Sequence, residues 1–252
     1  MTETGRIFLT AEWRYLAMLN YAIDPELLHP LVPPGTELDS WNGQTLVTLV
    51  GFLFLRTRVI GVPVPFHRDF EEVNLRFYVR RKTEGEWRRA VVFIQEIVPR
   101  AAVAWVARAL YGENYVQAPM SHQVECEEGH PGSVRRVIYS WRRGRQVNRL
   151  EVCVEGNSQT LGDSTLQEFI TDHSWGYSRR PGGGVFEYRV EHSRWRCWPA
   201  SGHVEGDLRG QYGDAFGQCL TSQRPHSALL AEGSPVRVYR PISLAANERV
   251  SS

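Results

Sequence analysis

The chain has 252 residues, and we expect one domain over residues 1–252, because strand-rich domains reach this length. A hydrophobic content of 42% and a charged content of 23% are those of a globular protein, which argues against disorder, collagen and coiled coil. With a formal net charge of +1, the protein lacks the strong positive field of proteins that bind nucleic acid or membrane surfaces, so neither partner is expected.

The cysteines and the apolar runs indicate a cytoplasmic protein. Four widely spaced cysteines without a secretory signal before them are typical of reduced thiols, namely Cys126, Cys153, Cys197 and Cys219. The longest apolar run, residues 46–55, is shorter than the about 18 residues that a transmembrane helix needs. It predicts a buried strand.

The first elements alternate between apolar runs and turn signals. Residues 15–23 are apolar on both faces, which favours a covered strand, although a helix also fits so short a run. Residues 24–34 predict a helix of about two turns, with Asp24 as its cap and Pro25 in its first position. Asn42-Gly43 predicts a hairpin turn before a long strand over residues 45–60.

The segment FEEVNLRFYVRRK, residues 70–82, alternates as a strand does. Its apolar residues point one way, and its polar residues point the other way together with a tyrosine: Glu72, Asn74, Arg76 and Tyr78. A second buried strand is predicted over residues 88–98, and residues 99–112 then change to a helical period. Whether the polar face lines a cavity or meets solvent stays open.

The second half of the chain returns to strands. Hairpins are predicted at residues 141–146 and 180–185, and short helices at residues 163–173 and within 207–220. Two capping boxes fit the helix at 163–173, Ser164 with Gln167 or Thr165 with Glu168. The pattern predicts an α+β fold built on a large, mostly antiparallel sheet or barrel with a few short flanking helices.

Several local motifs have ordinary structural interpretations. His67 and Asp69 beside the glutamates could contribute to a metal site, but hydrogen bonding is favoured, and we expect no metal and no cofactor. The mixture of arginine and aromatic residues at 135–149 surrounds a hairpin turn, which favours a solvated face over nucleic-acid binding. Adjacent residues on a strand face opposite sides, so Glu71 and Glu72 are not a close carboxylate pair.

Seven motifs spread over the chain resemble the YqjF-like family of uncharacterised proteins, and through it the acetoacetate-decarboxylase-like superfamily. They are LVTLVGFLF, VPVPFHRDF, FEEVNLRFYVRRK, ALYGENYVQAPM, LQEFITDHSWGYSR, EHSRWRCWP and LAEGSPVRVYRP. The resemblance implies a cone-shaped β-barrel with flanking helices.

Individual residues of the superfamily pattern can be carried over to this chain. The resemblance matches an early arginine, tyrosine and acidic residue with Arg14, Tyr21 and Asp24. It matches the segment of the catalytic glutamate with Asp69, Phe70 and Glu72, and the end of the helix before the reactive lysine with Arg108, Tyr111 and Gly112.

The chain then departs from the superfamily pattern where the Schiff-base lysine is expected. Tyr115 and Val116 stand in place of the two lysines, and a phenol cannot form an imine. Lys82 is the only lysine of the chain and lies in a polar turn. The resemblance therefore implies the pocket of a decarboxylase without its nucleophile.

The resemblance implies a small organic acid or carbonyl compound as the ligand. Glu72 and Tyr115 would be the catalytic residues: Glu72 as a general acid or base, and Tyr115 as the phenol at the reacting end of the ligand. Three further residues would bind the substrate: Arg14, Asn74 and Arg76. A lyase, isomerase or hydrolase that works without lysine stays open beside a non-catalytic protein in which an Arg14–Glu72 pair only shapes the barrel. A homo-oligomer stays open as well.

Overall fold

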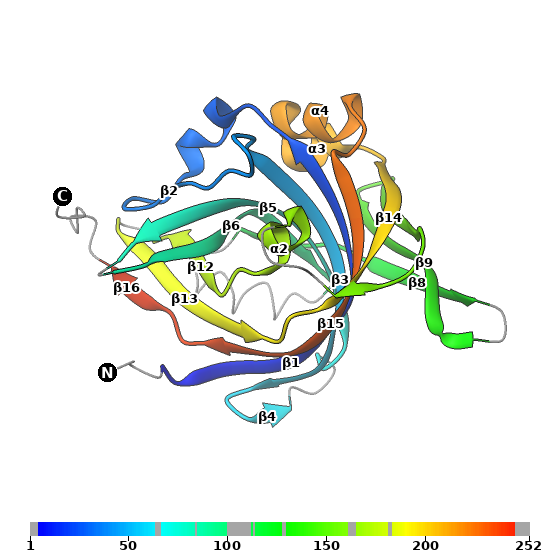
Figure 1. Ribbon diagram of the computed structural model, residues 1–252, viewed down its shortest axis with the longest axis horizontal. Helices are drawn as coiled ribbons and strands as arrows, with labels where there is room; N and C mark the ends of the chain where they lie inside the picture. Colours follow the sequence, from blue (N-terminus) through cyan, green and yellow to red (C-terminus); the bar gives the residue numbers. More distant parts are fainter. Residues whose placement is uncertain are drawn as a thin grey trace.

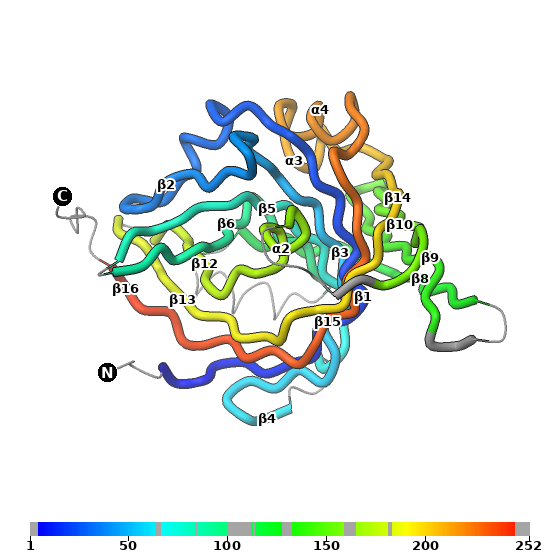
Figure 2. The backbone as a smooth tube through the Cα atoms, in the orientation of Figure 1, coloured from blue at the N-terminus to red at the C-terminus, as the bar shows by residue number. Residues whose placement is uncertain are grey.

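The protein is described by a computed structural model that covers residues 5–63, 67–83, 85–99, 112, 114–127, 130–160, 165–180 and 183–244. Figure 1 shows a ring of strands with short helices inside and outside it, and Figure 2 traces the same path along the backbone. The expected α+β fold is confirmed.

Seven strands close the barrel. In order around the ring they are β13 (Val185–His192), β12 (Trp175–Arg179), β6 (Trp87–Val98), β5 (Phe70–Lys82), β3 (Leu46–Val59), β1 (Ile7–Ala22) and β15 (Ser227–Tyr239). The ring closes where β13 pairs with β15. All the neighbours are antiparallel except β12 and β6, which pair in parallel through only two residue pairs. That seam has the fewest residue pairs of the seven pairings in the ring.

A second layer covers part of the barrel from outside. It continues the sheet beyond β15 through β14 (Arg196–Glu205), β10 (Gln146–Val154), β9 (His130–Arg143) and β8 (Met120–Glu127). Five short strands pair with the long ones: β2 (Glu37–Leu38) with β5, β4 (Val62–Pro63) with β3, β7 (Tyr115–Gln117) with β6, β11 (Gln159–Thr160) with β14, and β16 (Ile242–Leu244) with β13. Tyr139 of β9 packs so closely on Gly51 of β3 that a side chain at Gly51 would overlap its ring.

The helices lie on both sides of the wall. Helix α2 (Leu166–Thr171) lies within the ring in Figure 1, and its Phe169 and Ile170 belong to the inner core. Helices α3 (Leu208–Tyr212) and α4 (Asp214–Ser222) lie outside, where their apolar side chains join the outer core. The barrel wall therefore has apolar layers on both faces, which explains why its strands read as nearly continuous hydrophobic runs.

The turn at Asn42-Gly43 and the cap of helix α2 match the prediction, whereas the helix predicted at residues 24–34 does not form. Asn42 and Gly43 both have positive φ, 48° and 79°, as a type I′ turn requires. Thr165 accepts a hydrogen bond from the backbone of Glu168, which selects the second of the two capping boxes. The helix expected at 24–34 is instead two 3-10 turns, Pro25–Leu27 and His29–Leu31, because Pro30 lacks the N–H that a continuous helix needs.

The helix expected over residues 99–112 falls almost entirely outside the described residues, and with it Arg108 and Tyr111. Within the part of the chain that the structure describes, no helix is long and apolar enough to span a membrane.

Candidate functional site

The two adjacent glutamates of β5 lie on opposite faces of the barrel wall. Glu72 lies across from Phe52 of β3, a residue of the inner core. Glu71 lies across from Leu53, a residue of the outer core, and pairs with His122 at 2.7 Å. Glu72 is only 3% exposed. The expected division of the two carboxylates between the faces is confirmed, and the inner one is Glu72.

Two neighbouring side chains donate hydrogen bonds to the Glu72 carboxyl group. Asn74 Nδ2 lies 3.0 Å from Oε1, and the Tyr115 hydroxyl lies 3.4 Å from Oε2. Asn74 reaches Glu72 because residues two apart on a strand share a face. The structure thus brings together three of the five predicted site residues.

Tyr115 reaches the site through a short parallel strand. β7 pairs with β6 so that Tyr115 lies beside Glu96, and Glu96 lies beside Asn74 of β5. Asn74, Glu96 and Tyr115 therefore form one row across three strands. This pairing brings a residue more than 40 positions along the chain to the carboxyl group of Glu72.

Burial raises the pKa of Glu72 to about 7, because the carboxylate loses its hydration inside the barrel. The hydrogen bonds from Asn74 and Tyr115 and the charge of Arg76 lower the pKa, but they do not cancel the effect of burial. A carboxyl group with a pKa near 7 can both give and take a proton at neutral pH, as a general acid or base must.

Arg76 lies two residues beyond Asn74 on the same inner face and is 9% exposed. Its Nη2 donates to the carbonyl of Ile170 at 3.1 Å, and its guanidinium lies 5.9 Å from the centre of the Tyr78 ring. Among the described residues it forms no ion pair with a carboxylate, and its Nε has no hydrogen-bond partner. Among the described residues, the charge of Arg76 is therefore not neutralised by a direct ion pair, although it acts on the Glu72 carboxyl group.

Arg14 does not join this cluster, and the expected ion pair with Glu72 is wrong. Arg14 pairs with Glu12 at 3.7 Å and Glu232 at 4.0 Å on the outer side of the wall. The reason is a β-bulge: β1 has one extra residue between its pairings with β3 at Arg14 and at Ala17, and Tyr15 has a φ of 55°. The extra residue turns Arg14 to the face opposite Leu16.

The structure adds inner-face residues that the sequence analysis did not select. Thr48 donates to Asn20 at 2.7 Å and lies 2.5 Å from the hydroxyl of Tyr78. His173 follows helix α2 and stacks on the Tyr78 ring, with 4.8 Å between the ring centres. Tyr78 lies on the face that the alternation over residues 70–82 predicts for it. Nothing local to the sequence marks His173.

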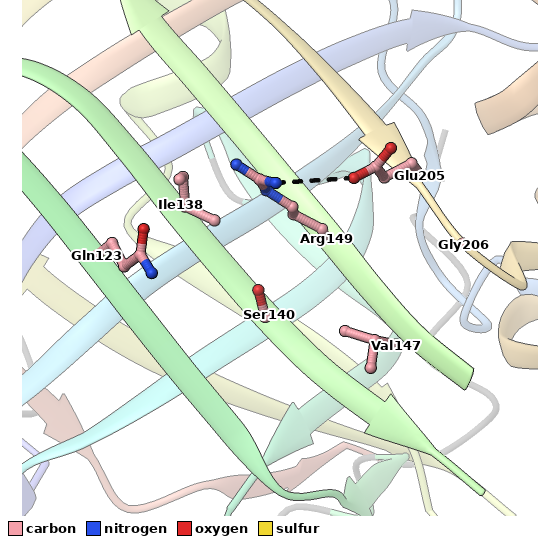
Figure 3. A pocket seen from close by; sticks show the side chains of 7 residues that line it. All are labelled: Gln123, Ile138, Ser140, Val147, Arg149, Glu205 and Gly206. Atoms are coloured by element: carbon pink, nitrogen blue, oxygen red, sulfur yellow. Dashed lines mark ion pairs between the residues drawn. The ribbon is translucent and has the colours of Figure 1, made fainter. Parts of the chain in front are cut away.

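Two hollows among the described residues lie away from this cluster. One, of about 520 Å³, crosses strands β8, β9 and β10, and Figure 3 shows Arg149 and Glu205 joined across it. Arg149 also pairs with Glu151 at 2.6 Å, so its charge is already compensated. The other, of about 530 Å³, lies between α4 and β14. Glu72 lines neither hollow.

The residues that the structure describes contain no group of three histidine, cysteine, aspartate or glutamate side chains that could hold a metal ion. Asp69 instead accepts a hydrogen bond from the backbone of Arg56 at 2.7 Å. This bond links the start of β5 to β3.

The fold is similar to that of several solved enzymes. The acetoacetate decarboxylase of Legionella pneumophila aligns with a TM-score of 0.68 and 13% identity over 94% of this chain and 87% of its own. An acetoacetate-decarboxylase-like enzyme from Sphingomonas wittichii aligns at 0.64 and 14% identity, over 95% and 93% of the two chains. The enduracididine biosynthesis enzyme MppR aligns at 0.66 and 15% identity, over 97% and 92%. These likenesses show the fold.

Sequence comparison identifies the family. The uncharacterized protein YqjF of Bacillus subtilis is 37% identical over 71 residues, a match that spans 28% of this chain and 29% of YqjF. The model of a family described as "Uncharacterized conserved protein (COG2071)" matches residues 10–235. The chain therefore belongs to this family, DUF2071, and has the fold of the acetoacetate-decarboxylase-like enzymes.

Proposed function

We propose that the barrel binds a small organic acid or carbonyl compound on its inner face, with Glu72 as the group that exchanges a proton with it. The observation that supports this proposal is the environment of Glu72. Glu72 is a buried carboxyl group with a pKa near 7, held by one amide and one phenol, and strongly shifted pKa values cluster at functional sites.

The proposed chemistry uses the protonated and the ionised form of one group. Protonated Glu72 can donate a hydrogen bond to the oxygen of a ligand carbonyl, which makes the neighbouring carbon atoms more acidic. Ionised Glu72 can accept a proton from such a carbon. The Tyr115 hydroxyl can stabilise the oxygen that gains negative charge, and the guanidinium of Arg76 can hold a carboxylate.

The solved relatives support this ligand class. One of them is described as a complex of MppR with pyruvate, and another as an acetoacetate decarboxylase, so keto acids are associated with enzymes of this fold. With sequence identities of 15% or less, these likenesses suggest a class of ligand for this chain and no particular substrate.

A non-catalytic binding protein is the alternative, and one measurement separates it from an enzyme. A working acid/base would speed the exchange of the α-protons of 4-oxopentanoate for deuterium in D₂O, as proton NMR can follow. Glu72→Gln, which keeps the shape but cannot take up the proton, should abolish that acceleration. If the wild type binds the ligand without any acceleration, the protein is a binder.

Binding itself should depend on Glu72 and not on its neighbour. Glu72→Leu should remain folded, because an apolar residue of similar size replaces a buried carboxyl group beside Phe52. It should lose the thermal stabilisation by acetoacetate, pyruvate and 4-oxopentanoate, which for a ligand at 100 times its dissociation constant amounts to about 2.7 kcal/mol.

Glu71→Leu is the matched control, because it makes the same change one residue away on the outer face. It should keep the stabilisation by ligand. If ligand stabilises the two variants equally, the ligand does not bind at the inner face of the barrel, and the proposal is wrong.

No ligand should become trapped as an imine. Tyr115 stands where a Schiff-base lysine is expected, and Lys82 is exposed at the end of β5. Borohydride added in the presence of acetoacetate or pyruvate should therefore leave the mass of the protein unchanged. A stable adduct on any residue other than the N-terminal amine, found by mass spectrometry of the peptides, would contradict this expectation.

A further inference from the structure

Polar atoms without a hydrogen-bond partner gather on the inner face of the barrel. Among the described residues they include Asn74 Oδ1, Arg76 Nε and both ring nitrogens of His173. Arg76 is 9% exposed and His173 is 7% exposed, so solvent does not satisfy them freely. More than about nine in ten buried polar groups in proteins are hydrogen-bonded, so such a concentration calls for a partner that binds here.

Arg76 and His173 lie next to each other although they come from different parts of the chain. Both contact the ring of Tyr78, the guanidinium at 5.9 Å and the imidazole at 4.8 Å from its centre. Both also lie near the carbonyl of Ile170, which accepts from Arg76 at 3.1 Å. The carbonyl of Ile170 does not form a hydrogen bond of good geometry with His173. Neither ring nitrogen of His173 therefore has a hydrogen-bond partner.

The charges around the two residues favour an anion. Arg89 also lies near His173, but Asp39 compensates its charge at 2.8 Å, whereas no carboxylate of the described residues pairs with Arg76. Burial, Arg89 and Arg76 together hold the pKa of His173 well below its usual value, so the imidazole is neutral. A neutral imidazole has one N–H to donate and one nitrogen to accept.

We propose that Arg76 and His173 form the subsite for the carboxylate of the ligand, an assignment that rests on the proposed function of the barrel. Arg76 holds the carboxylate through its Nε and a terminal nitrogen, the bidentate geometry that guanidinium groups prefer. His173 donates its N–H to the second carboxylate oxygen or to an adjacent hydroxyl group.

The spacing along β5 bears on the length of the ligand. Glu72 and Arg76 are four residues apart on one face, which corresponds to about 13 Å between their Cα atoms in a strand, and their side chains bridge part of that separation. A ligand that contacts both groups at once is therefore better served by a carboxylate that lies several bonds from its carbonyl. The subsite therefore favours a γ- or δ-keto acid such as 4-oxopentanoate over pyruvate.

The test replaces His173 by phenylalanine. His173→Phe keeps the aromatic contact with Tyr78 and removes only nitrogens that have no partner, so the ligand-free variant should melt at the temperature of the wild type or above it. Its affinity for 4-oxopentanoate, measured by calorimetry, should fall about ten- to a hundred-fold, the effect of one lost hydrogen bond to a charged group.

His192→Phe is the control for stability. His192 is half-buried and stacks on Trp195 with 4.3 Å between the ring centres, but its Nδ1 lies 3.0 Å from the carbonyl of Ser193. Loss of that bond should lower the melting temperature. If His173→Phe melts well below the wild type and binds 4-oxopentanoate equally well, His173 is a structural residue and the subsite is wrong.

The neutral amide 4-oxopentanamide separates this inference from the proposed function. Wild type should prefer the acid to the amide, and His173→Phe should lose most of that preference. Equal binding of acid and amide by the wild type, with binding still dependent on Glu72, would overturn the carboxylate subsite alone. Failure of both compounds to bind the wild type would overturn the subsite and the proposed function together.

Discussion

Replacing Glu187 by alanine should lower the free energy of unfolding by about 3 kcal/mol, because it leaves two arginines and a tyrosine without their common acceptor. Glu187 is 1% exposed and accepts from Arg81 at 3.2 Å, from Arg88 at 3.0 Å and from the Tyr177 hydroxyl at 2.6 Å. We expect the lower end of the range for broken buried ion pairs, because the Arg88 side chain is 28% exposed and can regain water.

The position of this cluster explains why the effect should be large for one side chain. Its members come from β13, β12, β6 and β5, and it spans the seam where β12 and β6 share only two residue pairs. The backbone pairs over only two residue pairs at that seam, so we expect the side chains around Glu187 to contribute much of the stability there. Amide hydrogen exchange in β12 should accelerate in the variant, because the seam would open locally.

Glu191 offers a matched control on the same strand. It also meets two arginines and a tyrosine, with Arg189 at 2.8 Å, Arg237 at 3.6 Å and the Tyr239 hydroxyl at 2.6 Å, but it is much more exposed than Glu187. Exposed ion pairs contribute little, so Glu191→Ala should cost about 1 kcal/mol or less in chemical denaturation. Equal losses in the two variants would mean that burial and the seam do not matter.

The sequence predicts features that short-range chemistry determines. The alternation over residues 70–82 sorts Glu72, Asn74 and Arg76 to one side, and the structure buries all three. Asn42-Gly43 forms the expected turn because its positive φ angles depend on the two residues themselves. The prediction of a closed barrel came from the superfamily resemblance, because the strand pattern alone does not distinguish a barrel from an open sheet.

The errors arose where a distant contact decides the outcome. Arg14 faces outward because of the bulge at Tyr15, whose carbonyl accepts a hydrogen bond from Tyr139 at 2.9 Å. That partner lies 124 residues away in the chain, so the local sequence around Arg14 does not predict that its side chain faces outward. His173 likewise depends on the placement of α2 within the ring. The sequence could therefore supply the inner residues of β5 but not the groups that other elements bring to them.

Stability should fall with rising pH because of Glu72. Its pKa is about 7 in the folded protein against an ordinary value of 4.5, so the folded state binds the proton more tightly than the unfolded state does. The corresponding stabilisation is complete below pH 4.5 and is lost as the pH rises through 7. Between pH 5 and pH 8 the wild type should lose about 2 kcal/mol relative to Glu72→Gln, since one pKa unit corresponds to about 1.4 kcal/mol.

Urea denaturation of both proteins at several pH values measures this difference, and comparison with Glu72→Gln cancels the titration of every other group. Tyr115→Phe removes a hydrogen bond that lowers the pKa of Glu72, so its pH dependence should extend to higher pH than that of the wild type. A difference between wild type and Glu72→Gln that stays constant from pH 5 to pH 8 would show that Glu72 is ionised throughout. A carboxyl group that carries no proton at neutral pH cannot donate one to a ligand, and the acid/base role proposed for Glu72 would then be wrong.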